Sequence, residues 1–186
     1  MSMEIRIISE ISELKNIQKI WKNLFLLSEY TAFQSYEFNY HSWKLELSKN
    51  SGNKLCIVLL EENESTFAIL PLYIDFRMKL RFINDIHADF CNFLSSKSID
   101  FSNVVDYLKK EIVFKSIRLI NIKPNTELYN SLIDCRKKNC IVRSISEYSL
   151  LNINKGNFPY NVTHYRSHQK HRINKAMKKY DGRESI

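Results

Sequence analysis

Apolar and polar positions along this 186-residue chain follow the period of a strand in some segments and that of a helix in others. Residues 4–9 alternate singly, which predicts a half-buried strand. An apolar stripe at three-to-four spacing, from Ile11 to Phe25, predicts a first helix. A second helix is expected after Ser35, a residue type that caps helix starts, and its aromatic residues are expected to be core.

Three strand-like runs come next, separated by short polar breaks. They cover Lys54–Glu61, Thr66–Asp75 and Lys79–Asn84 and predict an antiparallel meander. Pro71 in the middle run has no N–H to donate, so we expect that strand to be bulged or at an edge near the proline, and the sheet to open there. Residues 84–97 show no period and are expected to form a structured loop of the kind that lines sites.

The second half of the chain alternates helices with strands, which predicts crossover connections onto the same sheet. The expected fold class is therefore α/β, with a mixed sheet of the α+β kind. A last helix, basic and with one apolar face, is expected from about Val162 to Tyr180. We expect residues 1–158 to form one domain and residues 159–186 to form a connector helix. The elements expected before the connector are a helix over Ile99–Phe114, a strand over Ser116–Ile122, a helix over Thr126–Lys138 and a strand over Ile141–Asn152.

The positive charge of the chain is concentrated in this last helix, which suggests that the helix could bind a partner. The formal net charge of the chain is +8, and from His164 onward there are seven Lys and Arg residues and two acidic residues. Three interpretations stay open: a solvated polar face, a nucleic-acid contact, or an element that faces an anionic substrate. Nucleic acid is an unlikely partner by sequence, because no recognition motif accompanies the charge. The basic residues singled out for a binding role are Arg166, Lys170, Arg172 and Lys175.

Several site classes are disfavoured by what the sequence contains. No run approaches the ~20 apolar residues of a membrane-spanning helix, and the acidic start lacks the order of a secretory signal, so we expect a cytoplasmic protein. The four cysteines include no CxxC pair, so reduced thiols without zinc are expected. His164, His168 and His171 have a spacing that suits metal ligands, but the cations around them oppose a divalent ion.

Motifs for cofactors and for nucleophilic catalysis are missing as well. The three glycines are isolated, so no glycine-rich turn can bring backbone amides onto a pyrophosphate, and we expect no cofactor to be bound by this chain alone. No GxSxG or HExxH motif occurs. His87 and Asp89 form the best polar cluster. They are either a general base with an orienting carboxylate or part of a loop in which the aspartate caps a turn.

Four short motifs occur in an order that is typical of one protein family. Phe33-Gln34-Ser35 lies between a tryptophan-bearing helix and Trp43, Ile69–Leu72 is an apolar strand with a proline, residues 81–94 (RFINDIHADFCNFL) contain a loop aspartate, and HYRSHQKHRINKAMKKYDG is a basic helix. In these motifs the chain resembles the N-terminal half of FemAB-like acyltransferases of the GNAT superfamily, especially the CelD-type proteins of bacterial polysaccharide biosynthesis. The resemblance covers nearly the whole chain.

The resemblance implies transfer of an acyl group from coenzyme A to an amine or hydroxyl of a sugar or cell-envelope precursor. It makes Tyr36, Trp43 and Asp89 candidates for the substrate cleft, with Asp89 at the family's loop aspartate, and His87 joins them as the other member of the polar cluster in that loop. The half of such proteins that binds acetyl-CoA has no counterpart here, so we expect a truncated, substrate-side portion that is inactive alone. Its expected partners are a small-molecule or glycan-precursor acceptor and a second GNAT-like half. The alternative is a non-catalytic module that binds nucleic acid or another protein through the basic helix.

Overall fold

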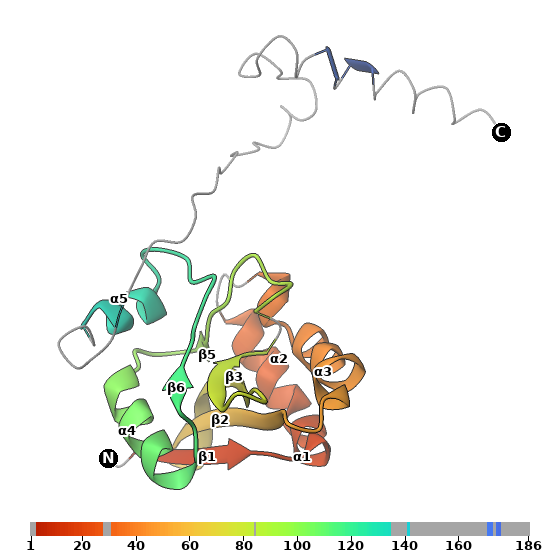
Figure 1. Cartoon of the computed structure of the whole chain (residues 1–186). Helices are drawn as coiled ribbons and strands as arrows, with labels where there is room; N and C mark the ends of the chain where they lie inside the picture. Colours follow the sequence, from red (N-terminus) through yellow and green to blue (C-terminus); the bar gives the residue numbers. More distant parts are fainter. Residues whose placement is uncertain are drawn as a thin grey trace. The chain divides into compact units, whose positions relative to one another are not determined.

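The computed structural model of the protein describes residues 3–27, 31–83, 85–134, 141, 171–172 and 174–175. The chain divides into two compact units, Met1–Arg143 and Ser144–Ile186. The first unit holds the sheet and the helices that cover it (Figure 1). The predicted domain boundary between residues 158 and 159 falls outside the described residues and stays a prediction.

The centre of the first unit is a mixed sheet, of which six strands are described. Their order is β1-β2-β3-β4-β6, and β5 pairs with β3 on the same edge as β4. All neighbours are antiparallel except β4 and β6, which are parallel. The predicted meander, the crossover and the mixed α/β fold class are therefore confirmed. The bounds are β1 Glu4–Ile8, β2 Lys54–Glu62, β3 Ser65–Ile74, β4 Lys79–Phe82, β5 Leu94–Ser95 and β6 Ser116–Ile117.

Strand β3 has two partners along one edge, and Pro71 lies where they part. Strand β4 pairs with β3 from Leu72 onward, whereas β5 pairs with it at Ala68 and Ile69. The carbonyl of Pro71 faces this edge and accepts a hydrogen bond from the amide of Ile83 at 2.9 Å. The missing N–H of the proline therefore falls between two ladders, where no donor is required. The sheet opens near Pro71 as predicted, while the bulge lies several residues away.

One face of the sheet is covered by the three N-terminal helices. Their apolar side chains pack against one set of alternate positions of β2 and β3, including Ile57 and Tyr73. The first predicted helix is divided at Ile17, where a backbone ψ of 5° separates α1 from α2. The expected cap at Ser35 is present, because its hydroxyl accepts from the amide of Phe38. The bounds are α1 Ile11–Asn16, α2 Gln18–Leu26, the 3-10 turn η1 Ala32–Gln34, α3 Tyr36–Leu45 and the 3-10 turn η2 Leu47–Lys49.

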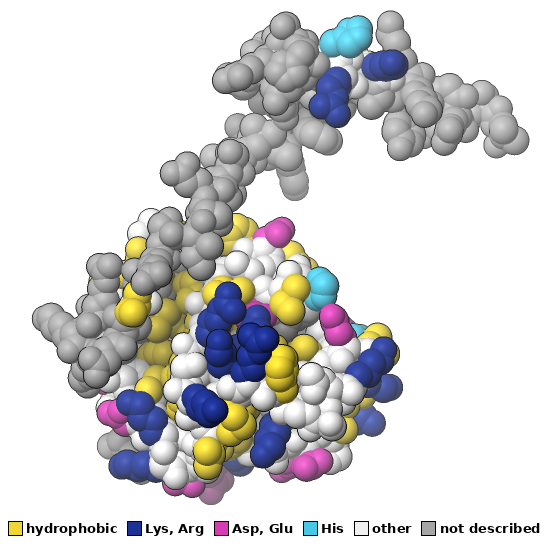
Figure 2. All heavy atoms as spheres, in the orientation of Figure 1, with side chains coloured by type: hydrophobic (Ala, Val, Ile, Leu, Met, Phe, Trp, Pro, Cys, Tyr) yellow, Lys and Arg dark blue, Asp and Glu magenta, His cyan; other side chains and the backbone are white. Residues whose placement is uncertain are grey.

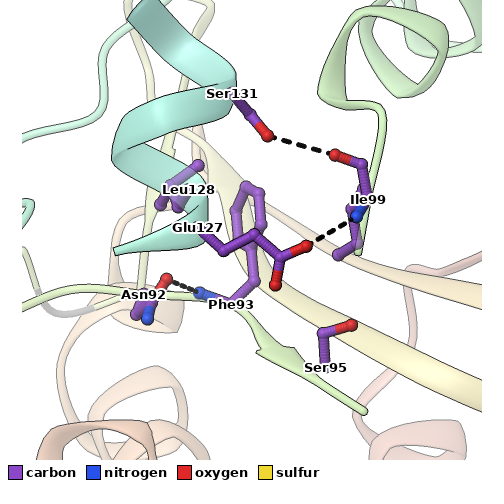
Figure 3. A pocket seen from close by; sticks show the side chains of 7 residues that line it. All are labelled: Asn92, Phe93, Ser95, Ile99, Glu127, Leu128 and Ser131. Carbon is purple, nitrogen blue, oxygen red and sulfur yellow. Dashed lines mark hydrogen bonds between the residues drawn. The ribbon is translucent and has the colours of Figure 1, made fainter. Parts of the chain in front are cut away.

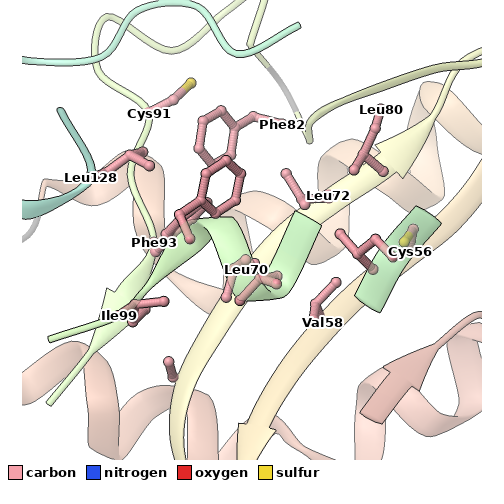
Figure 4. Packing of buried hydrophobic residues seen from close by; sticks show 14 of the residues in the cluster. Cys56, Val58, Leu70, Leu72, Leu80, Phe82, Cys91, Phe93, Ile99 and Leu128 are labelled. Atoms are coloured by element: carbon pink, nitrogen blue, oxygen red, sulfur yellow. The ribbon is translucent and has the colours of Figure 1, made fainter. Parts of the chain in front are cut away.

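The opposite face is covered by α4 and α5. Figure 4 shows the apolar cluster on this side, in which Phe82 and Phe93 pack among aliphatic residues of β2, β3 and β4. Asp100 caps α4 through its carboxylate, which is why the helix begins one residue later. The helix predicted over Ile99–Phe114 is confirmed with shorter bounds. The bounds are α4 Phe101–Glu111 and α5 Glu127–Asp134.

One predicted strand differs from the structure, and another lies almost entirely outside the described residues. The strand predicted over Ser116–Ile122 ends at Ile117, and the chain that follows it contains Asn121 in the left-handed region, with a φ of 60°. The strand predicted from Ile141 onward lies outside the described residues, except for Ile141 itself, which is exposed and not in a strand. Within the part of the chain that the structure describes, every helix is too short or too polar to span a bilayer.

Candidate functional site

The loop that connects β4 to β5 is the candidate site, and three sets of contacts hold its described residues in place. The first contact is made by Gln34, which is 3% exposed. Its side-chain nitrogen donates to the carbonyl of Phe90 at 2.7 Å. Its side-chain oxygen accepts from the amide and the hydroxyl of Thr31 at 3.1 Å and 2.8 Å. Both ends of the carboxamide are thus bonded, which fixes the loop to turn η1.

The second contact is a buried ion pair at the start of the loop. The Arg81 guanidinium donates from Nε to Oδ2 of Asp85 at 2.9 Å and from Nη2 to Oδ1 at 2.8 Å. The Asp85 side chain is 1% exposed, and Nη1 of Arg81 also lies 3.7 Å from Oδ2 of Asp75. A two-pronged arrangement of this kind is among the stronger hydrogen-bonded ion pairs in proteins. It ties the loop to β4 and to the end of β3.

The third contact comes from Asn121, in the segment after β6. Its side-chain nitrogen donates to the carbonyls of Asp85 and Ala88, each at 2.8 Å. Its own carbonyl accepts from the amide of Cys91 at 2.8 Å. Asn121 therefore makes hydrogen bonds to three residues of the loop. The predicted structured loop is confirmed, and its conformation is set by residues far from it in the sequence.

The anchored loop presents several side chains to solvent. Ile86 is 67% exposed, and the ring of His87 lies over the end of α3, where its Nε2 is 3.2 Å from Oε1 of Glu46. About half of each side chain of this pair is exposed. Asp89 is also exposed, and among the described residues it makes no hydrogen bond or ion pair with His87. The carboxylate beside His87 is thus Glu46, and catalytic roles for His87 and Asp89 stay predictions.

The other two cleft candidates lie inside the apolar cluster of the N-terminal helices. Tyr36 is 5% exposed and meets Trp21 edge-on, with ring centroids 5.9 Å apart. Trp43 is 7% exposed and packs against Tyr73. Burial raises the pKa of the Tyr36 hydroxyl, so it stays protonated at neutral pH. These positions agree with the expectation of core residues, while a role in a substrate cleft stays a prediction.

The basic C-terminal helix is described at a few positions only. His171, Arg172 and Lys175 are helical and exposed. Arg166 and Lys170 lie outside the described residues, as do His164 and His168, so the proposed binding role of this helix stays a prediction. In the described ranges, no three His, Cys, Asp or Glu side chains are grouped so that they could hold a metal ion.

A small cavity of about 60 Å³ lies between α5, β5 and the segment before α4 (Figure 3). Glu127 of α5 accepts from the amide of Ile99 at 3.0 Å, and Ser131 donates to the carbonyl of Ile99 at 3.1 Å. These two bonds dock α5 against the chain before α4. Ligand pockets commonly enclose about 300–1,000 Å³. The cavity is therefore a packing feature of the α5 docking site.

These residues differ in how far they could be predicted from the sequence. Gln34 stood within a recognised motif, but nothing marked its side chain as a link to the loop. Asn121 is of the residue type that most readily adopts a left-handed backbone, which is a usable signal for a turn. Glu46 carried no signal, because it lies 41 residues from His87 in the chain.

No protein-family model matches this chain, and no curated protein matches it. A similar solved structure is the crystal structure of a possible acetyltransferase from Clostridium difficile 630. Its TM-score is 0.40 and its sequence identity is 16%, over 82% of this chain and 99% of that chain. A likeness of this degree establishes neither a family nor an activity for the chain.

Proposed function

We propose that this chain supplies the acceptor-binding side of a GNAT-type acyltransferase. The reaction would move an acyl group from coenzyme A to an amine or hydroxyl of a small molecule or glycan precursor. The observation that carries the proposal is the exposed His87–Glu46 pair on a loop that is otherwise held by buried contacts. Rigidly held loops with exposed titratable side chains are where binding and catalytic groups concentrate.

The pair has the chemistry that an acyl acceptor needs. When Nε2–H of His87 is donated to Glu46, Nδ1 carries the lone pair and is able to accept a proton from the acceptor N–H or O–H. The acceptor atom then forms a bond to the thioester carbonyl carbon, the C–S bond breaks, and coenzyme A leaves as a thiolate, which takes up the proton from the His87 imidazolium. Glu46 would orient the ring and stabilise the imidazolium that forms.

The resemblance to FemAB-like proteins supports this assignment, because the motifs that carry it meet in space. The side chain of Gln34, in the Phe-Gln-Ser motif, donates a hydrogen bond to the loop at Phe90. The backbone carbonyl of Gln34 accepts a hydrogen bond from the indole N–H of Trp21 at 2.8 Å. Pro71 of the apolar strand motif bonds the start of the same loop through Ile83. Three motifs that are separated in the sequence therefore build one loop.

Acetyl-CoA or another acyl-CoA would be the acyl donor, and we propose that a second GNAT-like half binds it. The cavity beside Glu127 is too small for a coenzyme, and no described residue is assigned to that role. A thermal-shift titration of this 186-residue polypeptide with acetyl-CoA tests the division of labour. We expect no stabilisation. A bound ligand at a hundred times its dissociation constant would add about 2.7 kcal/mol, and such a gain would contradict the proposal.

A further inference from the structure

One edge of the sheet is strongly basic. Segments 76–84 and 112–126 contain six Lys and Arg residues and no acidic residue, and they form β4, β6 and the chain around them. Of the acidic residues next to these segments, Asp75 and Asp85 are buried and already contact Arg81. Glu111 and Glu127 are exposed, and Glu127 accepts a hydrogen bond from the amide of Ile99. Figure 2 shows Lys and Arg side chains gathered near the middle of one face of the first unit. The six cations are Arg77, Lys79, Arg81, Lys115, Arg118 and Lys123.

Lys79 and Arg118 project from the same face of this edge. Leu80 of β4 and Ile117 of β6 are register partners and both belong to the apolar cluster under α4 and α5. Arg118 directly follows β6, and its amide donates to the carbonyl of Leu80 at 2.9 Å, which continues the pairing with β4 by one residue. Side chains alternate between the two faces of paired chains, so Lys79 and Arg118 point to the opposite face. Their strands are neighbours, and the two side chains lie on a diagonal that long side chains can span.

Lys79 and Arg118 differ from Arg81 in that their positive charges are not paired with carboxylates of described residues. Arg81 is held by Asp85 and Asp75, and its side chain is 15% exposed. Arg118 is exposed, and neither it nor Lys79 makes an ion pair or a side-chain hydrogen bond with another described residue. Asp85 acts on Arg118 only through longer-range attraction. Two neighbouring cations with no partner of their own are a binding surface for a multivalent anion.

We infer that Lys79 and Arg118 bind the diphosphate group of a small-molecule ligand. A guanidinium pairs with phosphate oxygens in two-pronged fashion, and a nearby ammonium adds a second point of attraction, which suits two linked phosphates. The site adjoins the β4–β5 loop, because Asn121 follows Arg118 by three residues and bonds Asp85 and Ala88 on either side of His87 in sequence. A ligand held there by its diphosphate would extend toward the His87–Glu46 pair.

This inference rests on the proposed function for the identity of the ligand, but its test does not require acyl transfer. Inorganic pyrophosphate is titrated into the full 186-residue chain by calorimetry at low salt. We expect R118Q and K79Q each to weaken the dissociation constant at least tenfold, which corresponds to about 1.4 kcal/mol. The matched control is K110Q, which removes one positive charge from an exposed position on α4 and should change the constant less than twofold. Thermal unfolding confirms that each variant is folded.

Competition identifies the source of the diphosphate. Displacement of pyrophosphate by uridine diphosphate would assign the site to a nucleotide-linked acceptor. Displacement by coenzyme A would assign the site to the acyl donor and would contradict the proposal that a second half binds the donor. Absence of pyrophosphate binding, failure of both nucleotides to compete, or an equal loss in K110Q and R118Q would overturn the inference. The variant H87Q should retain pyrophosphate binding, so a failure of acyl-transfer chemistry and a failure of this site are distinguishable.

Discussion

The side-chain nitrogen of Gln34 donates to the carbonyl of Phe90 at 2.7 Å and so joins two segments that lie 56 residues apart. The bond is made by a nearly fully buried side chain, in which desolvation without a partner is costly. It connects turn η1, which follows α2, to the loop that carries His87. The geometry of that loop therefore depends on the packing of the N-terminal helices.

Replacing Gln34 by methionine tests this link with little change in volume. The variant leaves the carbonyl of Phe90 and the amide of Thr31 without their partner, so we expect a loss of about 1–3 kcal/mol in the free energy of unfolding. Amide hydrogen exchange should become faster for residues 85–93 of the β4–β5 loop than in the parent protein, with a smaller change in the strands of the sheet. Urea unfolding and exchange mass spectrometry measure the two effects. N103A, at an exposed position of α4, is the control, and equal exchange in both variants would argue against the link.

The Arg81–Asp85 pair gives a second prediction. R81M should destabilise the protein by about 3–5 kcal/mol, because it leaves the Asp85 carboxylate buried without its partner. The double variant R81M/D85L should recover a large part of that loss, since it removes the unpaired charge. Urea unfolding of the two single variants and the double variant measures the coupling. R77M, at an exposed neighbouring position, should stay within about 0.5 kcal/mol of the parent protein. Additive effects of the two substitutions would contradict this role.

Cys56 and Cys91 should be unreactive in the folded protein. Burial raises the pKa of each thiol to about 12, compared with an ordinary value of 9.0. The reactive thiolate at pH 8 is then roughly a thousandfold less populated than in the unfolded chain. In a C135S/C140S background, a chromogenic disulfide reagent should label both thiols at once in urea and only slowly in buffer. Rapid labelling of the folded protein would show that the apolar cluster is open.

The sheet could be predicted from the sequence because its central strands are long and sharply bounded. Lys54–Glu61 was predicted and Lys54–Glu62 is found, since the apolar run ends at charged residues. The proline of β3 also gave a correct signal for the place where the sheet opens. Strand β5 could not be predicted, because two residues are too few to show a period. The division at Ile17 was missed because the apolar stripe continues through it.

The candidate site could be predicted only in part. His87 was recognised as a titratable residue in a structured loop, and the carboxylate considered as its partner was Asp89, beside the alternative that this aspartate caps a turn. The direction of a side chain in a loop depends on the backbone, and this backbone is set by Gln34, Arg81 and Asn121. Contacts between residues so far apart in sequence leave no periodic pattern. The aromatic residues of α3 were correctly expected in the core, because helix spacing decides which side they face.

The central claim is that His87 acts as the base for acyl transfer. The most direct measurement is kcat/KM for acyl transfer by this chain together with the proposed half that binds acyl-CoA, in which H87Q is compared with H41Q, the control at an exposed histidine of α3. Loss of a positioned base commonly costs 10²–10⁴-fold, so we expect a fall of about that size in H87Q with binding of acyl-CoA unchanged. The activity of H41Q should stay within about twofold of the parent protein, because no hydrogen bond or ion pair between described residues joins that ring to the loop, and it is expected to accept no proton in the reaction. Equal activity in H87Q and H41Q would contradict the claim.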